Sequence, residues 1–252
     1  MTRVSVLKPK IANGLLLIFW ALTVLLLIVS SPMWTVSGAL FAQEQVSAAK
    51  YFDEATVKAV LETIRSRRTV REYQDTPIPA DHLLAILDAA RYAPTAGNVQ
   101  PWKFVVVQDR DRLDELSRVL QASWTEKVSA KPDLNEETRQ SHIEGGQEAI
   151  RNVMTAPVYV FIFVDTTVFP QYALYDGCLA VENLMLAARA MGYGTGFFTS
   201  YFPETVVKSF LDTPTALQLI CATPIGIPVE WPPVPEKKTL DEFIVYDRFT
   251  ER

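Results

Sequence analysis

The sequence predicts an α+β fold, in which a mixed β-sheet is flanked by helices. Three apolar runs, residues 104–107, 158–164 and 219–225, are rich in β-branched and aromatic residues and have the length of buried strands. Other segments carry apolar residues at helical spacing. Because these strands and helices alternate only loosely along the chain, a mixed sheet with helices on both faces fits better than a doubly wound parallel sheet.

Five segments are predicted to be helical. Residues 57–64 carry apolar residues at helical spacing and end in a basic cluster, and residues 83–90 repeat the spacing after a Pro-rich break. Residues 111–120 and 203–211 are predicted as further helices. Residues 176–191 are strongly apolar with few charges, so this helix is predicted to lie buried at the centre of the fold.

Two segments are predicted to lie outside this core. Residues 121–147 are polar and charged, and they fit either a mobile lid or a solvated pair of helices. Residues 228–252 begin Pro-rich, which predicts an extended arm rather than an independent domain.

The N-terminal segment, residues 1–42, is predicted to be a membrane anchor or a signal peptide. Basic residues precede an apolar run over 15–29, which with its flanks is long enough to span a bilayer as a helix. With its flanks, the run is longer than the usual core of a cleaved signal, which favours a single-pass anchor over a secreted or periplasmic protein after cleavage. The positive-inside rule places the N-terminus in the cytoplasm, so that the folded part is exported. Residues 43–55 are predicted as a linker and residues 56–252 as the folded domain.

Composition narrows the classes of function. A net charge of −5 with no evident basic face argues against a nucleic-acid partner. The two cysteines, Cys178 and Cys221, lie in apolar runs and are predicted to be buried free thiols. The two histidines, His82 and His142, share no ligand spacing, so no metal site is expected.

A cluster of arginines follows the first predicted helix. Arg67, Arg68 and Arg71 lie within five residues together with Thr69. Because guanidinium groups match phosphate oxygens in charge and geometry, the cluster predicts a phosphate-bearing cofactor, with a solvated basic turn as the alternative.

Three further motifs are weaker alone. Residues 93–102 form a loop of small residues that would let the backbone approach a flat ligand closely. Residues 192–196 are glycine-rich, but they follow a helix, whereas a dinucleotide-binding fingerprint follows a strand and opens a helix. Lys237 and Lys238 form a basic pair in the predicted arm.

Taken in order, these motifs resemble the nitroreductase family. The Arg-Arg-Thr-x-Arg motif stands at residues 67–71, and the Ala-Pro-Thr-x-x-Asn-x-Gln-Pro-Trp motif at 93–102, with Thr95 in place of the family's serine. The Gly-x-Gly-Thr turn at 192–195 and the closing basic pair follow in the expected order. The resemblance covers residues 56–245.

The resemblance implies a homodimer that swaps its C-terminal arms and holds flavin mononucleotide (FMN) at the dimer interface. Arg67, Arg68 and Thr69 match the positions that bind the FMN phosphate and ribityl chain. Arg71 matches the position beside the flavin N1 and C2 oxygen. The loop that packs on the flavin from the partner subunit matches Pro94, Thr95, Ala96 and Asn98.

Two more pairs are carried over from the resemblance. Thr199 and Ser200 lie near the position from which family members contact flavin N5. Lys237, with Lys238 as second choice, matches a phosphate-binding position in the arm where the family more often has arginine.

The implied activity is a ping-pong reaction in which NADH or NADPH gives a hydride to flavin N5 and a small acceptor, such as a nitroaromatic or a quinone, then takes the electrons. No catalytic side chain beyond the flavin is required. The alternatives are a specialised membrane-associated flavin reductase, such as a reductive dehalogenase, or a non-catalytic flavin-binding redox sensor. Residues 121–147 contain no tyrosine, so the Glu–Tyr–Lys set of the iodotyrosine deiodinases is not found there.

Overall fold

A computed structural model describes residues 53–249 of the chain. The predicted anchor, residues 1–42, and most of the predicted linker lie outside the described residues. The fold presented below is that of the unit beginning at Val60. Helix α3 (Glu54–Ser66) leads the chain into it, at the place where the spacing of apolar residues predicts a helix.

The sheet has four strands in the order β1-β2-β4-β3. They are β1 (Trp102–Val107), β2 (Val158–Asp165), β3 (Gly194–Thr195) and β4 (Leu217–Gly226). All three strand pairs are antiparallel, and within the described part of the chain parallel pairing is limited to single bridges such as Thr69 to Thr195. The α+β class is therefore confirmed, and so are the three predicted strands, but the four strands form an antiparallel sheet and not the predicted mixed sheet.

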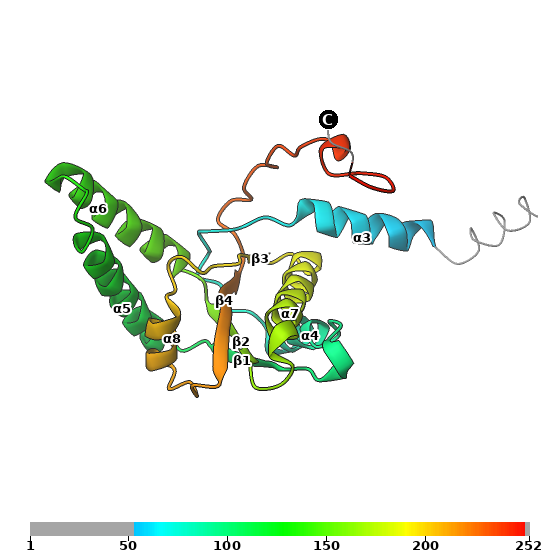
Figure 1. Ribbon diagram of the computed structural model, residues 1–252, viewed down its shortest axis with the longest axis horizontal. Helices are drawn as coiled ribbons and strands as arrows, with labels where there is room; N and C mark the ends of the chain where they lie inside the picture. Colours follow the sequence, from blue (N-terminus) through cyan, green and yellow to red (C-terminus); the bar gives the residue numbers. More distant parts are fainter. Residues whose placement is uncertain (1–52, 250–252) are drawn as a thin grey trace, which may run out of the picture. The chain divides into compact units, whose positions relative to one another are not determined.

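Strand β2 separates two hydrophobic cores. Its residues alternate between them: Val158, Val160, Ile162 and Val164 pack in one cluster. Tyr159, Phe161 and Phe163 pack in the other. This alternation follows from the two-residue period of a strand, and it explains why the run is continuously apolar. Figure 1 shows α4 and α7 on one face of the sheet and α5, α6 and α8 on the other.

The predicted helices are confirmed, with shifted ends. Besides α3, they are α4 (Ala80–Ala90), α5 (Arg110–Ser129), α7 (Pro170–Ala190) and α8 (Glu204–Phe210). A further helix, α6 (Glu136–Val153), follows α5. Residues 121–147 form the end of α5 and most of α6, which agrees with the helix-pair interpretation. Asp109 caps α5 by accepting from the Arg112 amide at 2.9 Å, and Asn135 caps α6 by accepting from the Thr138 amide at 2.8 Å.

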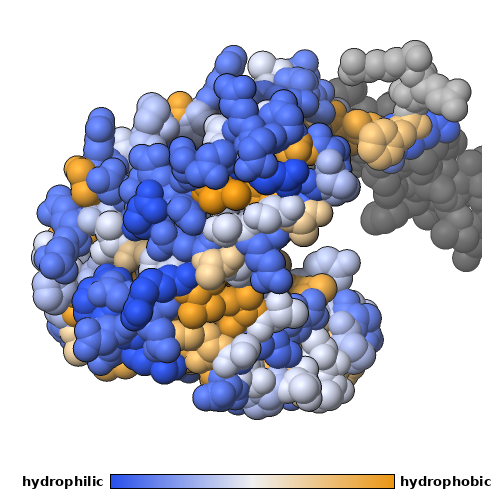
Figure 2. Space-filling view, turned by 90° about the vertical axis from the view of Figure 1, so that its left-hand side faces the viewer, coloured by the Kyte–Doolittle hydropathy of each residue, from blue (hydrophilic) through white to orange (hydrophobic). Residues whose placement is uncertain are grey.

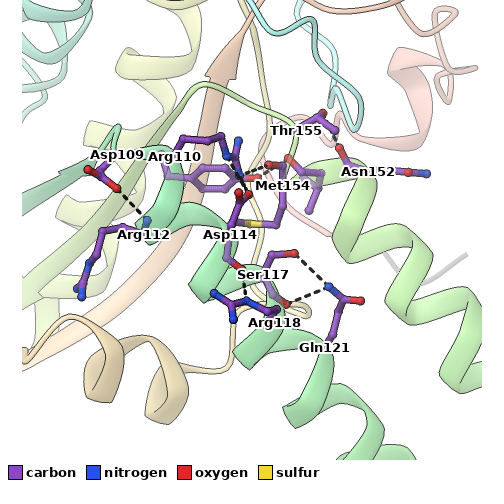
Figure 3. A network of polar contacts seen from close by, with 12 residues as sticks. Asp109, Arg110, Arg112, Asp114, Ser117, Arg118, Gln121, Asn152, Met154 and Thr155 are labelled. Carbon is purple, nitrogen blue, oxygen red and sulfur yellow. Dashed lines mark hydrogen bonds and ion pairs between the residues drawn. The ribbon is translucent and has the colours of Figure 1, made fainter.

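A polar network joins the first turn of α5 to the last turn of α6 (Figure 3). The Arg110 guanidinium donates to the Asp114 carboxylate at 2.9 Å and to the Met154 carbonyl at 3.1 Å. The neighbouring Thr155 hydroxyl accepts from the Tyr73 amide at 2.9 Å. Burial raises the pKa of Tyr73 and of Tyr159 well above the usual range, so both phenols stay neutral in the core beneath this network.

Helix α7 differs from the prediction of a fully buried helix. One side packs on the sheet, at Gly177 and Leu184 among others, but the opposite side is exposed and apolar. Its exposed residues include Tyr172, Leu174, Tyr175 and Leu179. Cys178 lies on this side, so the prediction that both thiols are buried is wrong for Cys178 and confirmed for Cys221. Burial raises the pKa of the Cys221 thiol to about 12.

The C-terminal residues form the predicted extended arm. Beyond Pro228 the chain has no strand up to residue 249, and one 3₁₀ turn, Leu240–Glu242, interrupts it. The arm exposes large apolar side chains: Val234, Leu240, Phe243, Val245, Tyr246 and Phe249. Figure 2 shows further hydrophobic residues at the surface of a face that is otherwise mostly hydrophilic. Among the described helices, none is both long and apolar enough to cross a membrane.

Candidate cofactor-binding site

The arginine segment, residues 67–71, runs beside the short strand β3. Thr69 bridges to Thr195 in parallel, and the Val70 amide donates to the Thr195 carbonyl at 2.9 Å. The Val70 side chain is buried, whereas Arg71 is exposed. A side chain at Gly194 would place its Cβ 2.6 Å from Val70, so a glycine is required for this close approach. The segment is therefore fixed to the edge of the sheet.

Two guanidinium groups of this segment have unsatisfied donors. Arg67 Nε and Arg68 Nε are buried without a hydrogen-bond partner. The nearest carboxylate oxygen to Arg67 Nε belongs to Glu182 of α7 at 3.7 Å, too far for a hydrogen bond. Arg68 Nη1 donates to the carbonyls of Arg65 and Arg67 at 2.8 and 2.7 Å, which holds the group in place. Since a buried unpaired donor is costly, the pair fits an anionic ligand such as a phosphate.

The beginning of the C-terminal arm lies against the same segment. A pocket of about 320 Å³ has Thr69, Arg71 and Glu72 on one side. The arm supplies its other side, with Glu230, Trp231, Pro232 and Pro233. The Arg189 guanidinium of α7 lies 4.0 Å from the centre of the Trp231 ring. Its Nε also donates to the Ser66 hydroxyl at 3.0 Å, which ties the arm, α7 and the end of α3 together.

The second predicted element, residues 94–98, is a tight turn beside the first half of α7. Gly97 and Asn98 both have positive φ, 58° and 56°, which the glycine adopts freely and the asparagine tolerates. The Ala96 amide lies 3.4 Å from the Asp176 carboxylate. Asn98 is exposed, so its amide group is accessible to a ligand.

A single chain does not assemble these two elements into one site. The 94–98 turn contacts α7 near Asp176 and the preceding Phe169, whereas the arginine segment contacts it at Glu182. From Asp176 to Glu182 the helix axis rises about 9 Å, and from Phe169 to Glu182 about 20 Å. Among residues 53–249, no hydrogen bond or ion pair joins the two elements.

The remaining predicted residues are accessible. Thr199 and Ser200 are exposed in the loop after β3, between the bridge from Phe198 to Ala222 and a turn closed by the Phe202 amide on the Thr199 carbonyl at 3.1 Å. Lys237 and Lys238 are exposed in the arm. The Lys238 ammonium lies 3.6 Å from Glu242, within the arm itself. In the part of the chain described, no contact joins either lysine to the arginine segment.

Sequence reasoning missed several residues around the site. Asp176 and Glu182 are carboxylates in an otherwise apolar helix, and that contrast is a signal that the sequence does contain. The stacking of Arg189 on Trp231 has no such signal, because the two residues are far apart along the chain.

Comparisons with known proteins identify the family of the chain. Residues 64–227 match the model of the Nitroreductase family. The chain is 30% identical over 188 residues to 5,6-dimethylbenzimidazole synthase of Rhodospirillum rubrum, covering 69% of this chain and 84% of that protein. It is 27% identical over 199 residues to a putative NADH dehydrogenase/NAD(P)H nitroreductase of Methanothermobacter thermautotrophicus, covering 77% and 90%.

The fold of this chain is also similar to that of a solved structure. The nitroreductase with bound FMN from Bacteroides fragilis is 25% identical and superimposes with a TM-score of 0.60, covering 78% of this chain and all of that one (100%). The arginine segment, the 94–98 turn and the antiparallel sheet all fall within the matched residues. The chain belongs to the nitroreductase family.

Proposed function

We propose that this protein is an FMN-dependent oxidoreductase that takes electrons from NADH or NADPH and passes them to a small acceptor such as a nitroaromatic or a quinone. The observation that carries the proposal is the pair of buried, unpartnered guanidinium donors at Arg67 and Arg68, in the segment that matches the family's motif. The FMN-bound structure of the Bacteroides fragilis relative supports the choice of cofactor.

Each residue of the arginine segment has its own proposed role. Arg67, Arg68 and Thr69 bind the phosphate and ribityl chain, and Arg71 lies beside the flavin N1 and C2 oxygen. When bound, FMN supplies the redox chemistry, accepting a hydride at N5 and releasing the electrons to the acceptor. The exposed Arg71 guanidinium stabilises negative charge that develops near N1. The protein therefore orients one face of the flavin and tunes its potential.

The site requires a second copy of the chain. The apolar face of α7, with Tyr175 69% exposed, and the apolar side chains of the arm are both largely uncovered by the described residues. A twofold axis across α7 would bring the first half of one helix beside the second half of the other. It would thereby place the 94–98 turn of one subunit near the arginine segment of its partner.

The same dimer gives the remaining residues their roles. Pro94, Thr95, Ala96 and Asn98 pack on the flavin from the partner subunit, and Thr199 and Ser200 contact its N5 edge. The arms exchange between subunits, and Lys237 or Lys238 adds a positive charge at the phosphate. A lysine there is a point charge and lacks the two parallel bonds of an arginine.

A spectroscopic experiment on the full-length chain tests the cofactor and the activity. The purified protein should show flavin absorption, or acquire it on addition of FMN. Anaerobic NADH or NADPH should bleach it, and nitrofurazone should restore it. A ping-pong reaction gives parallel lines in double-reciprocal plots when donor and acceptor are varied together. If neither the purified protein nor a mixture with excess FMN shows bound flavin, the proposal is wrong.

The alternatives give different results in the same experiment. Bleaching by dithionite but by neither nicotinamide would favour a specialised electron source or a redox sensor. Dehalogenation of an aromatic substrate by the reduced protein, without reduction of nitroaromatics, would favour a reductive dehalogenase.

We also propose that residues 1–42 anchor the protein in a membrane. The support is the apolar run over residues 15–29, preceded by basic residues. A reporter that is active only after export, fused after Arg252, should be active, and a silent reporter would rule out export. Mass spectrometry of the mature N-terminus distinguishes an anchor from a cleaved signal.

A further inference from the structure

The Trp124 side chain packs against the neighbouring helix at a position where only a glycine leaves enough room. It belongs to α5, and its indole N–H donates across to the His142 carbonyl of α6 at 2.9 Å. Directly opposite is Gly146, where a Cβ would come within 1.9 Å of the indole nitrogen. Gly145, its neighbour in α6, has nothing within 4 Å of the same hypothetical atom. Gly145 can therefore be replaced by alanine without a collision, whereas Gly146 cannot.

The other side of the Trp124 ring contacts the loop that follows β3. Its centroid lies 5.7 Å from that of Tyr201, and the two rings are tilted by 59°. The ammonium of Lys127 lies 5.7 Å from the centroid of the same indole. The Trp124 ring therefore bridges the α5–α6 hairpin and this loop.

Tyr201 follows directly after the exposed pair Thr199 and Ser200. Backbone contacts hold the loop at Phe198, which bridges to Ala222, and at Phe202, which is buried. Between these two residues, the Tyr201 ring contacts the Trp124 ring. An aromatic pair of this kind adds stabilisation beyond that from its buried area, which favours one loop conformation.

We propose that Trp124, which packs against Gly146, is a positioning residue. It fixes Tyr201 and thereby holds Thr199 and Ser200 at the flavin. This inference rests on the proposed function, because the role of the Thr199–Ser200 pair at N5 is part of that function. Displacing the indole leaves the fold and the phosphate contacts in place, but it releases the loop. The flavin environment and the rate of its reduction then change, whereas FMN binding does not.

The two adjacent glycines provide a matched pair of variants. Both Gly145→Ala and Gly146→Ala improve helix propensity by the same amount, but only Gly146→Ala collides with the indole. A second pair acts from the loop, where Tyr201→Phe keeps the ring and Tyr201→Leu removes it. The measurements on the full-length, FMN-saturated protein are the flavin reduction potential, the absorption maximum, the rate of reduction by NADH or NADPH, and the affinity for FMN.

Gly146→Ala and Tyr201→Leu should each shift the absorption maximum and the potential and slow flavin reduction about tenfold, equivalent to about 1.4 kcal/mol in the barrier. Their FMN affinity should stay within twofold of the wild type. Gly145→Ala and Tyr201→Phe should match the wild type in every measurement. If the Gly146→Ala protein does not fold, the comparison of Tyr201→Leu with Tyr201→Phe tests the proposal.

The possible failures are separable. A wild-type protein that binds no FMN overturns the proposed function and this inference with it. A wild-type protein that binds FMN and is reduced, with Gly146→Ala and Tyr201→Leu indistinguishable from it, overturns the inference alone. So does an equal loss in Gly145→Ala and Gly146→Ala, or in Tyr201→Phe and Tyr201→Leu.

Discussion

The buried Nε atoms of Arg67 and Arg68 are the strongest residue-scale sign of a ligand in this molecule. In a folded protein nearly every buried polar group has a partner, and an arginine donor left without one costs stability. Both groups are held by the backbone around them, through the bridge of Thr69 to Thr195 and the bonds from Arg68 to two carbonyls. This local order would favour the binding of a phosphate.

Replacing Arg67 should weaken FMN binding without unfolding the protein. A hydrogen bond to a charged group contributes about 1.5–3 kcal/mol, so Arg67→Ala should raise the dissociation constant of FMN roughly tenfold to a hundredfold. The matched control is Arg65→Ala, which removes an exposed arginine from the last turn of α3. Titration of the flavin-free protein followed by flavin fluorescence measures both. If the two variants weakened FMN binding equally, the effect of Arg67 would be explained by its positive charge alone and not by a specific contact.

Arg71 should affect the flavin potential more than the affinity. Its charge favours the reduced flavin, so Arg71→Ala should lower the potential by about 30 mV, equivalent to about 1.4 kcal/mol for a two-electron couple. Arg71→Lys keeps the charge and should lie between the wild type and Arg71→Ala. Equilibration with a reference dye under anaerobic conditions measures the potentials. An unchanged potential in a fully FMN-loaded Arg71→Ala protein would contradict the assignment of Arg71 to the N1 edge.

At the scale of elements, α7 connects the sheet to both halves of the site. Its buried side packs so closely on the sheet that a Cβ at Gly177 would lie 2.7 Å from Ile220 and from Val164. The same helix contacts the 94–98 turn through Asp176 and the arginine segment through Glu182. Any change in how α7 sits on the sheet therefore moves both parts of the site.

Gly177→Ala should destabilise the protein and disturb this arrangement. Overpacking of a close contact costs about 1–3 kcal/mol, and the gain in helix propensity, about 1 kcal/mol, offsets part of it. Gly145→Ala has the same gain without a collision, so the difference between the two variants isolates the cost of the contact. Urea unfolding followed by circular dichroism measures both free energies. Equal stabilities would mean that α7 relaxes away from the sheet at little cost.

The sequence predicts the type and position of the helices and strands better than it predicts which side of each one is buried. Strand β2 and helix α7 are both long apolar runs, and their types and positions follow from length and periodicity. The exposure of Cys178 does not follow, because an apolar helix looks the same whether a sheet or a second subunit covers its far side. The arginine segment can be recognised in the sequence because guanidinium groups suit a phosphate. The packing of Trp124 on Gly146 cannot, because it depends on a contact between α5 and α6 that no local sequence pattern predicts.

At the scale of the whole molecule, one chain presents the two parts of the candidate site at separate places. The arginine segment and the 94–98 turn contact different stretches of α7, and the arm exposes apolar residues such as Tyr246, which is 80% exposed. Monomeric proteins rarely expose so much large apolar surface. A symmetric dimer would cover these surfaces and complete two equivalent sites.

Mixing two inactive variants tests this arrangement directly. In one chain Arg67→Ala and Arg68→Ala together remove the phosphate contacts, and in the other Asn98→Ala and Thr95→Ala remove those of the turn. Each homodimer has two damaged sites. In the proposed dimer each site takes its two parts from different subunits, so a heterodimer would have one site with both defects and one with neither.

The heterodimer, purified with two different affinity tags, should bind about half as much FMN as the wild type and have about half its reductase activity. Both homodimers should bind little flavin at the same FMN concentration. If the arginine segment and the turn of one chain served the same site, every site in the heterodimer would keep one of the two defects. No activity would then be recovered, and the proposed exchange between subunits would be wrong.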